Sequence, residues 1–218
     1  MKPGIGRSLL AAMAGLATMI TIVALAILVF LNPLYVGFEQ ERTGVPALTG
    51  YDEATVQRVT NSILHDLVFG PPDFAVQVAG VPVLGEREQA HMADVRNVFF
   101  AFGALALLAI LILVNLLIVG RKQAWFRRAV RHGAIVLAFI VVILGILAAV
   151  AFDTVFETFH KLFFPAGSFD FDASSKLIQL FPDQFWFETS LLLGLVILGL
   201  SGLVAVLSSG GREDPSPA

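Results

Sequence analysis

Four long apolar runs constrain the fold of this chain more than any other feature of its sequence. They cover residues about 9–31, 95–119, 134–152 and 187–207. A helix needs about 20 apolar residues to cross the hydrocarbon core of a bilayer, and each run comes close to that length or exceeds it. The 218-residue chain is 57% hydrophobic and only 14% charged, which is too apolar for a soluble domain of this size. We therefore predict an all-α membrane protein with four transmembrane helices, folded as a single membrane domain over residues 1–218.

The first run is predicted to be a retained helix, because it is longer than the apolar region of a signal peptide and ends at Asn32 and Pro33 without a small-x-small cleavage site. Four crossings then put both termini on the same side. The short segment 120–133 carries five basic residues, which indicates the cytoplasmic side. We therefore expect both termini to be cytoplasmic, residues 32–94 and 153–186 to form a small extracytoplasmic cap, and the polar tail, residues 208–218, to be disordered.

The predicted cap contains one amphipathic helix. Apolar residues in segment 52–69 recur at helical spacing opposite a charged face, and a Gly-Pro-Pro sequence ends the pattern. Residues 74–84 favour a short extended piece. The helix that follows is expected to begin near residue 86 and to continue without a break into the second span.

Small residues lie at helical spacing within two of the predicted spans, at Gly145 and Ala149 and at Gly199 and Gly202. Such residues let helix backbones approach closely. Ordinary membrane-helix composition explains most of them equally well.

Residues 153–186 are rich in phenylalanine for a link between two spans, and two interpretations are open. Interfacial aromatic belts are common in membrane proteins and would account for the segment. Alternatively, the rings line a pocket for acyl chains at the membrane surface, and a belt that curls inward could do both. The residues expected to contact such a substrate are Phe159, Phe163, Phe164, Phe169, Phe181 and Trp186, and the same lining includes Phe156, Phe171 and Phe185.

The sequence carries none of the usual catalytic signatures. The absence of Cys excludes disulfides, thiol nucleophiles and thiolate metal sites. The G-x-S-x-G, H-E-x-x-H, P-loop and G-x-G-x-x-G motifs are missing too. Any chemistry must then rest on histidines and carboxylates. His132 in the basic segment and His65 beside Asp66 on the amphipathic helix are typical of interfacial or surface residues.

His91 and His160 occupy more informative positions. His91 precedes Asp94 by three residues just before the second span, and His160 follows Glu157 by three residues just beyond the third. One helical turn brings each imidazole near a carboxylate, which can fix its tautomer and support it as a base. The two histidines are therefore a candidate catalytic pair.

Arg96 lies at the mouth of the second span and needs a partner if it faces the interior of the helix bundle. Asp94 is two positions away and points elsewhere on the helix. We therefore expect an ion pair between Arg96 and either Asp153 or Glu157.

Three stretches of the chain resemble a family of small bacterial integral membrane proteins. They read H-M-A-D-V-R from residue 91, F-H-K-L-F-F-P-A-G from residue 159 and L-I-Q-L-F-P-D-Q-F-W from residue 177. Some members of that family are lipoprotein intramolecular transacylases. The resemblance covers nearly the whole chain, including the four spans, the cap and the order of the two histidine motifs. It departs near Phe169, where some relatives have a Trp.

The resemblance implies a four-helix protein of the bacterial cytoplasmic membrane with its active face outside. The implied reaction moves the sn-2 acyl chain of a diacylglyceryl-cysteine lipoprotein to that cysteine's own amine and leaves a lyso-form lipoprotein. His91 and His160 correspond by motif to the family's catalytic pair, and their roles as base and acid are left open. Because amine and ester belong to one head group, the reaction needs no enzyme nucleophile, cofactor or metal. The implied partners are the lipoprotein and the bilayer, without nucleic acid, and the oligomeric state is left open.

Two other functions remain open from the sequence. A metal-dependent membrane hydrolase could hold a cation with both imidazoles and the carboxylates of Asp94 and Glu157. A non-enzymatic membrane protein with a partner-binding cap would fit the missing catalytic signatures. Transport is less favoured, because none of the four spans carries an ionisable residue at mid-bilayer.

Overall fold

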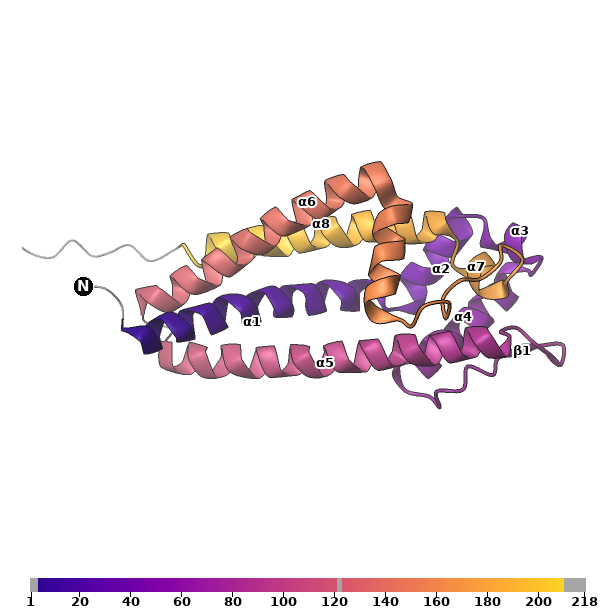
Figure 1. The fold of residues 1–218 in the computed structure, drawn as a ribbon, viewed down its shortest axis with the longest axis horizontal. Helices are drawn as coiled ribbons and strands as arrows, with labels where there is room; N and C mark the ends of the chain where they lie inside the picture. Colours follow the sequence, from indigo (N-terminus) through magenta and orange to yellow (C-terminus); the bar gives the residue numbers. More distant parts are fainter. Residues whose placement is uncertain (1–3, 121–122, 210–218) are drawn as a thin grey trace, which may run out of the picture. The chain divides into compact units, whose positions relative to one another are not determined.

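The structure is a computed structural model that describes residues 4–120 and 123–209. Four of its helices are long and apolar enough to cross a membrane: α1 (Ile5–Phe30), α5 (Glu86–Gly120), α6 (Ala124–Phe163) and α8 (Asp183–Leu207) (Figure 1). The protein is an all-α membrane protein with four transmembrane helices, as the apolar runs predict. Residues 121–122 of the basic segment and residues 210–218 of the predicted disordered tail lie outside the described residues.

The chain divides into two compact units, and each of the four long helices contributes residues to both. The first, which we call the bundle unit, comprises Met1–Ala26, Gly103–Leu144 and Gly194–Ala218. The second comprises Ile27–Phe102 and Gly145–Leu193. We call it the site unit, because His91 and His160 both belong to it.

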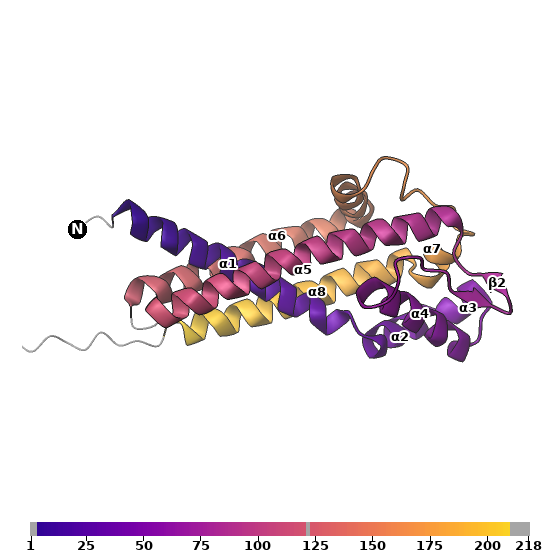
Figure 2. The same ribbon diagram turned by 90° about the horizontal axis from the view of Figure 1, so that it is seen from below.

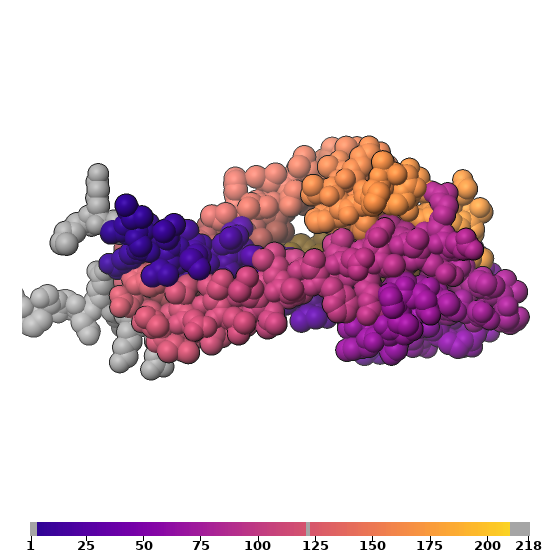
Figure 3. All heavy atoms as spheres, turned by 60° about the horizontal axis from the view of Figure 1, so that its bottom comes forward, coloured from indigo at the N-terminus to yellow at the C-terminus, as the bar shows by residue number. Residues whose placement is uncertain are grey.

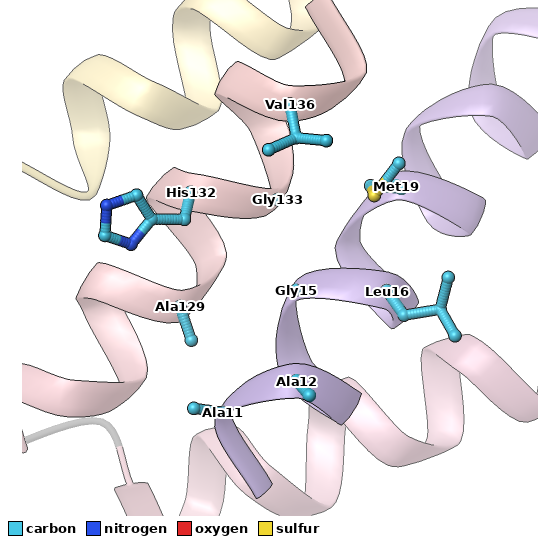
Figure 4. Close-up of a pocket in the computed structure, with 9 residues that line it drawn as sticks. All are labelled: Ala11, Ala12, Gly15, Leu16, Met19, Ala129, His132, Gly133 and Val136. Carbon is cyan, nitrogen blue, oxygen red and sulfur yellow. The ribbon is translucent and has the colours of Figure 1, made fainter. Parts of the chain in front are cut away.

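In the bundle unit, α1 and α6 approach each other at two glycines, Gly15 and Gly133 (Figure 4). A methyl group added to Gly133 would lie 2.4 Å from the carbonyl oxygen of Gly15. Ala14, Phe126 and Ala129 form a packed cluster in the same unit. Because lipid gives helices little hydrophobic drive to associate, close backbone contact of this kind holds them together.

The glycines suggested by spacing alone make no such contact. A Cβ atom at Gly145, Gly199 or Gly202 would meet nothing within 4 Å in the described part of the chain. Spacing shows where a helix has a small face, but it does not show which two faces meet.

The site unit has an apolar core of buried side chains. Asp52 caps the N-terminus of α4 (Glu53–Val68), inside the segment predicted to be an amphipathic helix. Its apolar face enters the core through Val56, Val59, Ile63 and Leu67. Three short helices that the sequence pattern did not reveal complete the core: α2 (Pro33–Arg42) and α3 (Val45–Thr49) pack against α4, and α7 (Lys176–Leu180) packs against α3.

The extended piece predicted within residues 74–84 is a two-residue antiparallel ladder of β1 (Gln77–Val78) and β2 (Val81–Pro82). Ala79 and Gly80 make the turn with φ values of 52° and 78°. Positive φ at both central residues is what the commonest two-residue hairpin turn requires.

The helix α5 runs unbroken from Glu86 to Gly120, so the expected continuity from the cap segment into the second apolar run is confirmed. At 1.5 Å per residue its 35 residues extend about 52 Å, whereas the hydrocarbon core is about 30 Å thick. Its first turns, which include His91, precede the membrane-spanning part predicted from residue 95.

The helix α6 does not end with the third apolar run but continues to Phe163. The backbone leaves helical geometry at Ala151 (φ −145°, ψ 53°), and the chain changes direction there (Figure 1). The first part of the phenylalanine-rich segment is therefore a short helical arm within the site unit. His160 lies on this arm, which runs beside α5 (Figure 2).

Candidate active site

His91 of α5 and His160 of α6 face each other in the site unit. The centroids of their rings are 6.1 Å apart, and the ring planes differ by 24°. The first turns of α5 supply one ring, and the arm beyond Ala151 supplies the other. The two histidine motifs recognised in the sequence therefore converge on one place.

The tautomer of His160 follows from one hydrogen bond. Its Nδ1 atom lies 2.8 Å from the backbone carbonyl oxygen of Phe156, and a carbonyl oxygen can only accept. Nδ1 of a neutral His160 must therefore carry the proton. The lone pair is then on Nε2, and the ring is fixed as a proton acceptor at that atom.

His91 lies in a drier environment. Its side chain is 7% exposed, and its Nδ1 atom is buried without a hydrogen-bond partner among the described residues. Burial and, to a smaller extent, the nearby charge of His160 lower the pKa of His91 to about 4, although Asp94 opposes both. The imidazole is therefore neutral near pH 7, with one polar atom unpartnered, which is unusual in a folded protein.

Aromatic rings enclose the pair. Phe164 is buried and contacts both histidines, with its centroid 4.8 Å from that of His91 and 5.5 Å from that of His160. Phe171 lies 5.6 Å from the ring of His91. The remaining rings within 6 Å of His160 are Phe156 (4.2 Å), Phe159 (5.6 Å) and Phe169 (5.3 Å).

The other rings expected to line a substrate site are not in contact with the histidines. Phe163 packs on Phe159 with centroids 4.8 Å apart, and both are about half exposed. Trp186 reaches the site only through Phe156, 6.1 Å away. Phe181 is buried in the core of the site unit, where it contacts Phe185.

Neither of the two carboxylates expected to orient the imidazoles, Glu157 and Asp94, is hydrogen-bonded to its histidine in the described residues. Glu157 pairs with Lys161 (2.5 Å) on the exposed side of the arm, so the prediction that it orients His160 is wrong. The imidazole reaches back four residues to a backbone carbonyl instead. Asp94 is half-buried one turn from His91 and acts on it through charge, and the described residues show no hydrogen bond between the two side chains.

The predicted ion pair of Arg96 with Asp153 or Glu157 is also wrong. The guanidinium donates to the backbone carbonyl oxygens of Asp66 and Gly70, the latter at 2.5 Å, and stacks over Phe100 at 4.9 Å. These carbonyls lie at the C-terminal end of α4, where helix geometry leaves acceptors without partners. Arg96 thus ties α5 to α4 rather than to the arm of α6.

Two residues of the first turn of α5 support the site and were missed in the sequence. Glu88 is buried and accepts from the backbone N–H groups of Gly85 (2.5 Å) and Leu177 (3.0 Å) and from the hydroxyl of Ser175. Its position three residues after the helix cap is a capping-box signal, but its bonds to the start of α7 have no local signature. Arg87 donates to the loop that follows α6.

The other two histidines have separate surroundings. His65 is exposed on α4, with its Nδ1 atom 3.3 Å from the Asp66 carboxylate. His132 is on α6 beside the Gly15–Gly133 approach in the bundle unit (Figure 4). Among the residues that the structure describes, no three His, Asp or Glu side chains converge on a common metal position.

Four membrane-crossing helices and two facing imidazoles within a shell of aromatic rings define a class, the polytopic membrane proteins whose site is a histidine pair. The chain belongs to the lipoprotein intramolecular transacylase (Lit) family, whose model matches residues 11–186.

Individual relatives are distant in sequence. An uncharacterised protein of Aquifex aeolicus (strain VF5) is 28% identical over 112 residues, which is 51% of this chain. The chain thus matches 50% of the length of that relative.

The fold is shared with a solved structure, that of the membrane-integral lipoprotein intramolecular transacylase Lit from Bacillus cereus. The TM-score is 0.79 at 22% identity, over 95% of this chain and 96% of that one. Variants of the same Bacillus cereus protein with one histidine replaced by arginine or alanine match with TM-scores of 0.75.

Proposed function

We propose that this protein is a lipoprotein intramolecular transacylase. It would move the sn-2 acyl chain of a diacylglyceryl-cysteine lipoprotein to the free amine of the same cysteine, leaving a lyso-form lipoprotein. Membership of the Lit family supports the reaction class. The observation that carries the proposal is the convergence of His91 and His160, with 6.1 Å between their rings, in a largely apolar setting.

His160 is the general base in this proposal. Its Nδ1–H donates to the Phe156 carbonyl, so its Nε2 lone pair is free to take the proton from the attacking amine. As the new C–N bond forms and the C–O bond of the ester breaks, the same imidazolium returns that proton to the leaving glycerol oxygen. The proton thus moves from nitrogen to oxygen, and no other reactant is consumed.

His91 is the hydrogen-bond donor to the ester carbonyl oxygen. A pKa lowered by burial makes it a poor base and keeps it neutral, and a neutral imidazole still has one N–H to donate. Its buried Nδ1 atom has no hydrogen-bond partner among the described residues, which leaves this ring nitrogen available to a group of the substrate. A donor placed where negative charge develops is among the largest contributions an enzyme makes to rate.

The remaining parts of the site favour transfer over hydrolysis. The amine and the ester belong to one head group, so the protein only has to fold that group into a reactive geometry. Phe164, Phe169 and Phe171 reduce the access of water to the pair. Exposed rings such as Phe159 and Phe163 suit contact with acyl chains at the membrane surface.

The proposed location is the outer face of the bacterial cytoplasmic membrane, with both termini in the cytoplasm. The basic residues of segment 120–133 support this orientation through the positive-inside rule. The histidine pair would then lie at the outer face, where mature lipoproteins are.

The test uses purified protein in liposomes with a synthetic diacylglyceryl-cysteine lipopeptide. We expect mass spectrometry to show an N-acylated lyso-product from the free-amine lipopeptide and none from an N-acetylated one. His91→Ala and His160→Ala should remove the product, whereas His65→Ala and His132→Ala should leave it unchanged. A chelator such as EDTA should have no effect.

The alternatives predict different results. Loss of activity with EDTA would favour the alternative that the protein is a metal-dependent hydrolase. A well-folded protein that leaves both lipopeptides unchanged, and whose histidine variants retain the phenotype of the wild type in cells, would favour the non-enzymatic cap and overturn the proposed function.

A further inference from the structure

We propose that Arg87 is a positioning residue of the site, which holds the loop after α6 so that Phe169 and Phe171 enclose the two histidines. This inference rests on the proposed function and adds a residue to it. Arg87 itself touches neither imidazole among the contacts that the structure describes. It acts through the loop backbone.

The contacts of Arg87 are specific. It lies one helical turn before His91 on α5, and its Nη2 atom donates to the carbonyl oxygens of Gly167 and Asp170, both at 3.0 Å. The centre of the guanidinium lies 5.6 Å from the ring of Phe171. The Arg87 side chain therefore bonds to two backbone carbonyls of the loop and lies over one aromatic ring. Figure 3 shows atoms of the segment after α6 against the start of α5.

This loop carries two of the aromatic rings around the histidine pair. Asp170, whose carbonyl accepts from Arg87, stands between Phe169 and Phe171. Phe169 lies 5.3 Å from His160, and Phe171 lies 5.6 Å from His91. Arg87 is therefore bonded to the backbone between the ring that meets one histidine and the ring that meets the other.

The loop has little else to hold it. The backbone N–H of Ser168 donates to the carbonyl of Pro165 (3.1 Å) and closes a β-turn. Gly167 has a φ of 79°, the positive value that a type II turn requires at its third residue. These bonds shape the loop internally. Among the described residues, three hydrogen bonds join residues 165–174 to the rest of the site unit: the two from Arg87, and one from the backbone N–H of Ser175, directly after the segment, to the carbonyl of Asp172 (2.8 Å).

Helix electrostatics do not account for a cation at this position. Arg87 lies in the first turn of α5, where the helix dipole favours negative charge and Glu86 and Glu88 supply it. An arginine there is mildly unfavourable for the helix, so its place is explained by the loop. Arginine suits the task because its planar group can donate in a fixed geometry and stack on an aromatic ring, which a lysine ammonium does less well.

The experiment compares Arg87→Ala and Arg87→Lys with the matched control Arg58→Ala, an exposed arginine of α4 whose side chain bonds only weakly to Thr55 within its own helix. We measure kcat and KM for the free-amine lipopeptide and amide hydrogen exchange over residues 165–171. For Arg87→Ala we expect faster exchange in the loop and a drop in kcat of about tenfold or more, with KM changed by less than about threefold, because small displacements of a catalytic geometry cost rate. Arg87→Lys should fall between, and added guanidinium should restore part of the kcat of Arg87→Ala. The control should match the wild type in every measurement.

The outcomes separate this inference from the proposed function. Faster loop exchange with an unchanged kcat would overturn the positioning role and leave the transacylase proposal intact. If amide hydrogen exchange in the loop were unchanged in Arg87→Ala, Arg87 would not be what holds the loop in place. A wild-type protein that forms no lyso-product would overturn the proposed function and, with it, the role of Arg87 in that reaction.

Discussion

The bundle unit and the site unit hide their polar groups in different ways. In the bundle unit, the buried hydroxyl of Thr18 donates to the carbonyl of Ala14 in its own helix (2.7 Å). In the site unit, the buried amide of Gln40 joins three elements, since it donates to the carbonyl of Leu180 and accepts from the hydroxyl of Thr60, both at 2.8 Å. Both units have polar side chains bonded within their own helix, but Gln40 of the site unit also bonds between helices.

The difference follows from the surroundings of each unit. Helices in lipid satisfy their backbone internally and associate by close packing, so Gly15 and Gly133 serve where a larger residue would not. A unit with an apolar core and exposed polar surfaces can also use directional bonds between elements. The two facing imidazoles belong to this second unit.

The largest expected effect separates the two units by activity. His160→Ala should lower the rate of acyl transfer at least about 100-fold, because a positioned general base contributes on the order of 10²–10⁴. His132→Ala, in the bundle unit, should change the rate less than twofold. Rates measured by mass spectrometry on proteins of equal thermal stability would check this, and equal losses in both variants would contradict the comparison.

The next expected effect is on stability and concerns a buried carboxylate of the site unit. Glu88→Ala leaves the N–H groups of Gly85 and Leu177 without their acceptor, so we expect a loss of about 2–4 kcal/mol in the free energy of unfolding. Glu88→Gln should lose less. The exposed Glu41→Ala is the matched control and should stay within about 0.5 kcal/mol. Denaturant unfolding in detergent measures all three, and equal stability of Glu88→Ala and the control would show that the bonds of Glu88 are not needed.

The pH dependence of stability should report His91. Its pKa is about 4 in the folded protein and 6.5 in an ordinary setting, so between these values the unfolded chain binds the proton and the folded protein does not. The folded state therefore loses stability as the pH falls through this window, by about 2 kcal/mol between pH 8 and pH 5. His91→Asn should remove that part of the slope. Melting temperatures of both proteins across this range provide the measurement, and parallel curves would mean that His91 is not buried as described.

The smallest expected effect concerns the helix crossing of the bundle unit. Gly133→Ala places a methyl group against the backbone of Gly15 and should cost about 1–3 kcal/mol. Gly103→Ala, where the added Cβ has open space, should be neutral or stabilising by up to about 1 kcal/mol. Unfolding in detergent compares the two variants. A harmless Gly133→Ala would show that α1 and α6 do not depend on this contact.

Much of the fold and part of the site could be predicted from local patterns. Apolar runs of membrane length predicted the four helices, and the spacing of Val56, Val59 and Ile63 predicted α4. The positions of His91 and His160 beside two apolar runs singled them out as a pair. Each of these signals repeats within a few residues or depends on residue type alone, so one sequence is enough to carry it.

The partners of the polar groups were decided only by the tertiary structure. His160 donates to a backbone carbonyl rather than to Glu157, and Arg96 binds the end of α4 rather than Asp153. Arg87 binds loop carbonyls about 80 positions away in the chain. Every residue has a carbonyl, so an acceptor of this kind leaves no mark in the sequence, and only the folded chain determines which one a side chain meets.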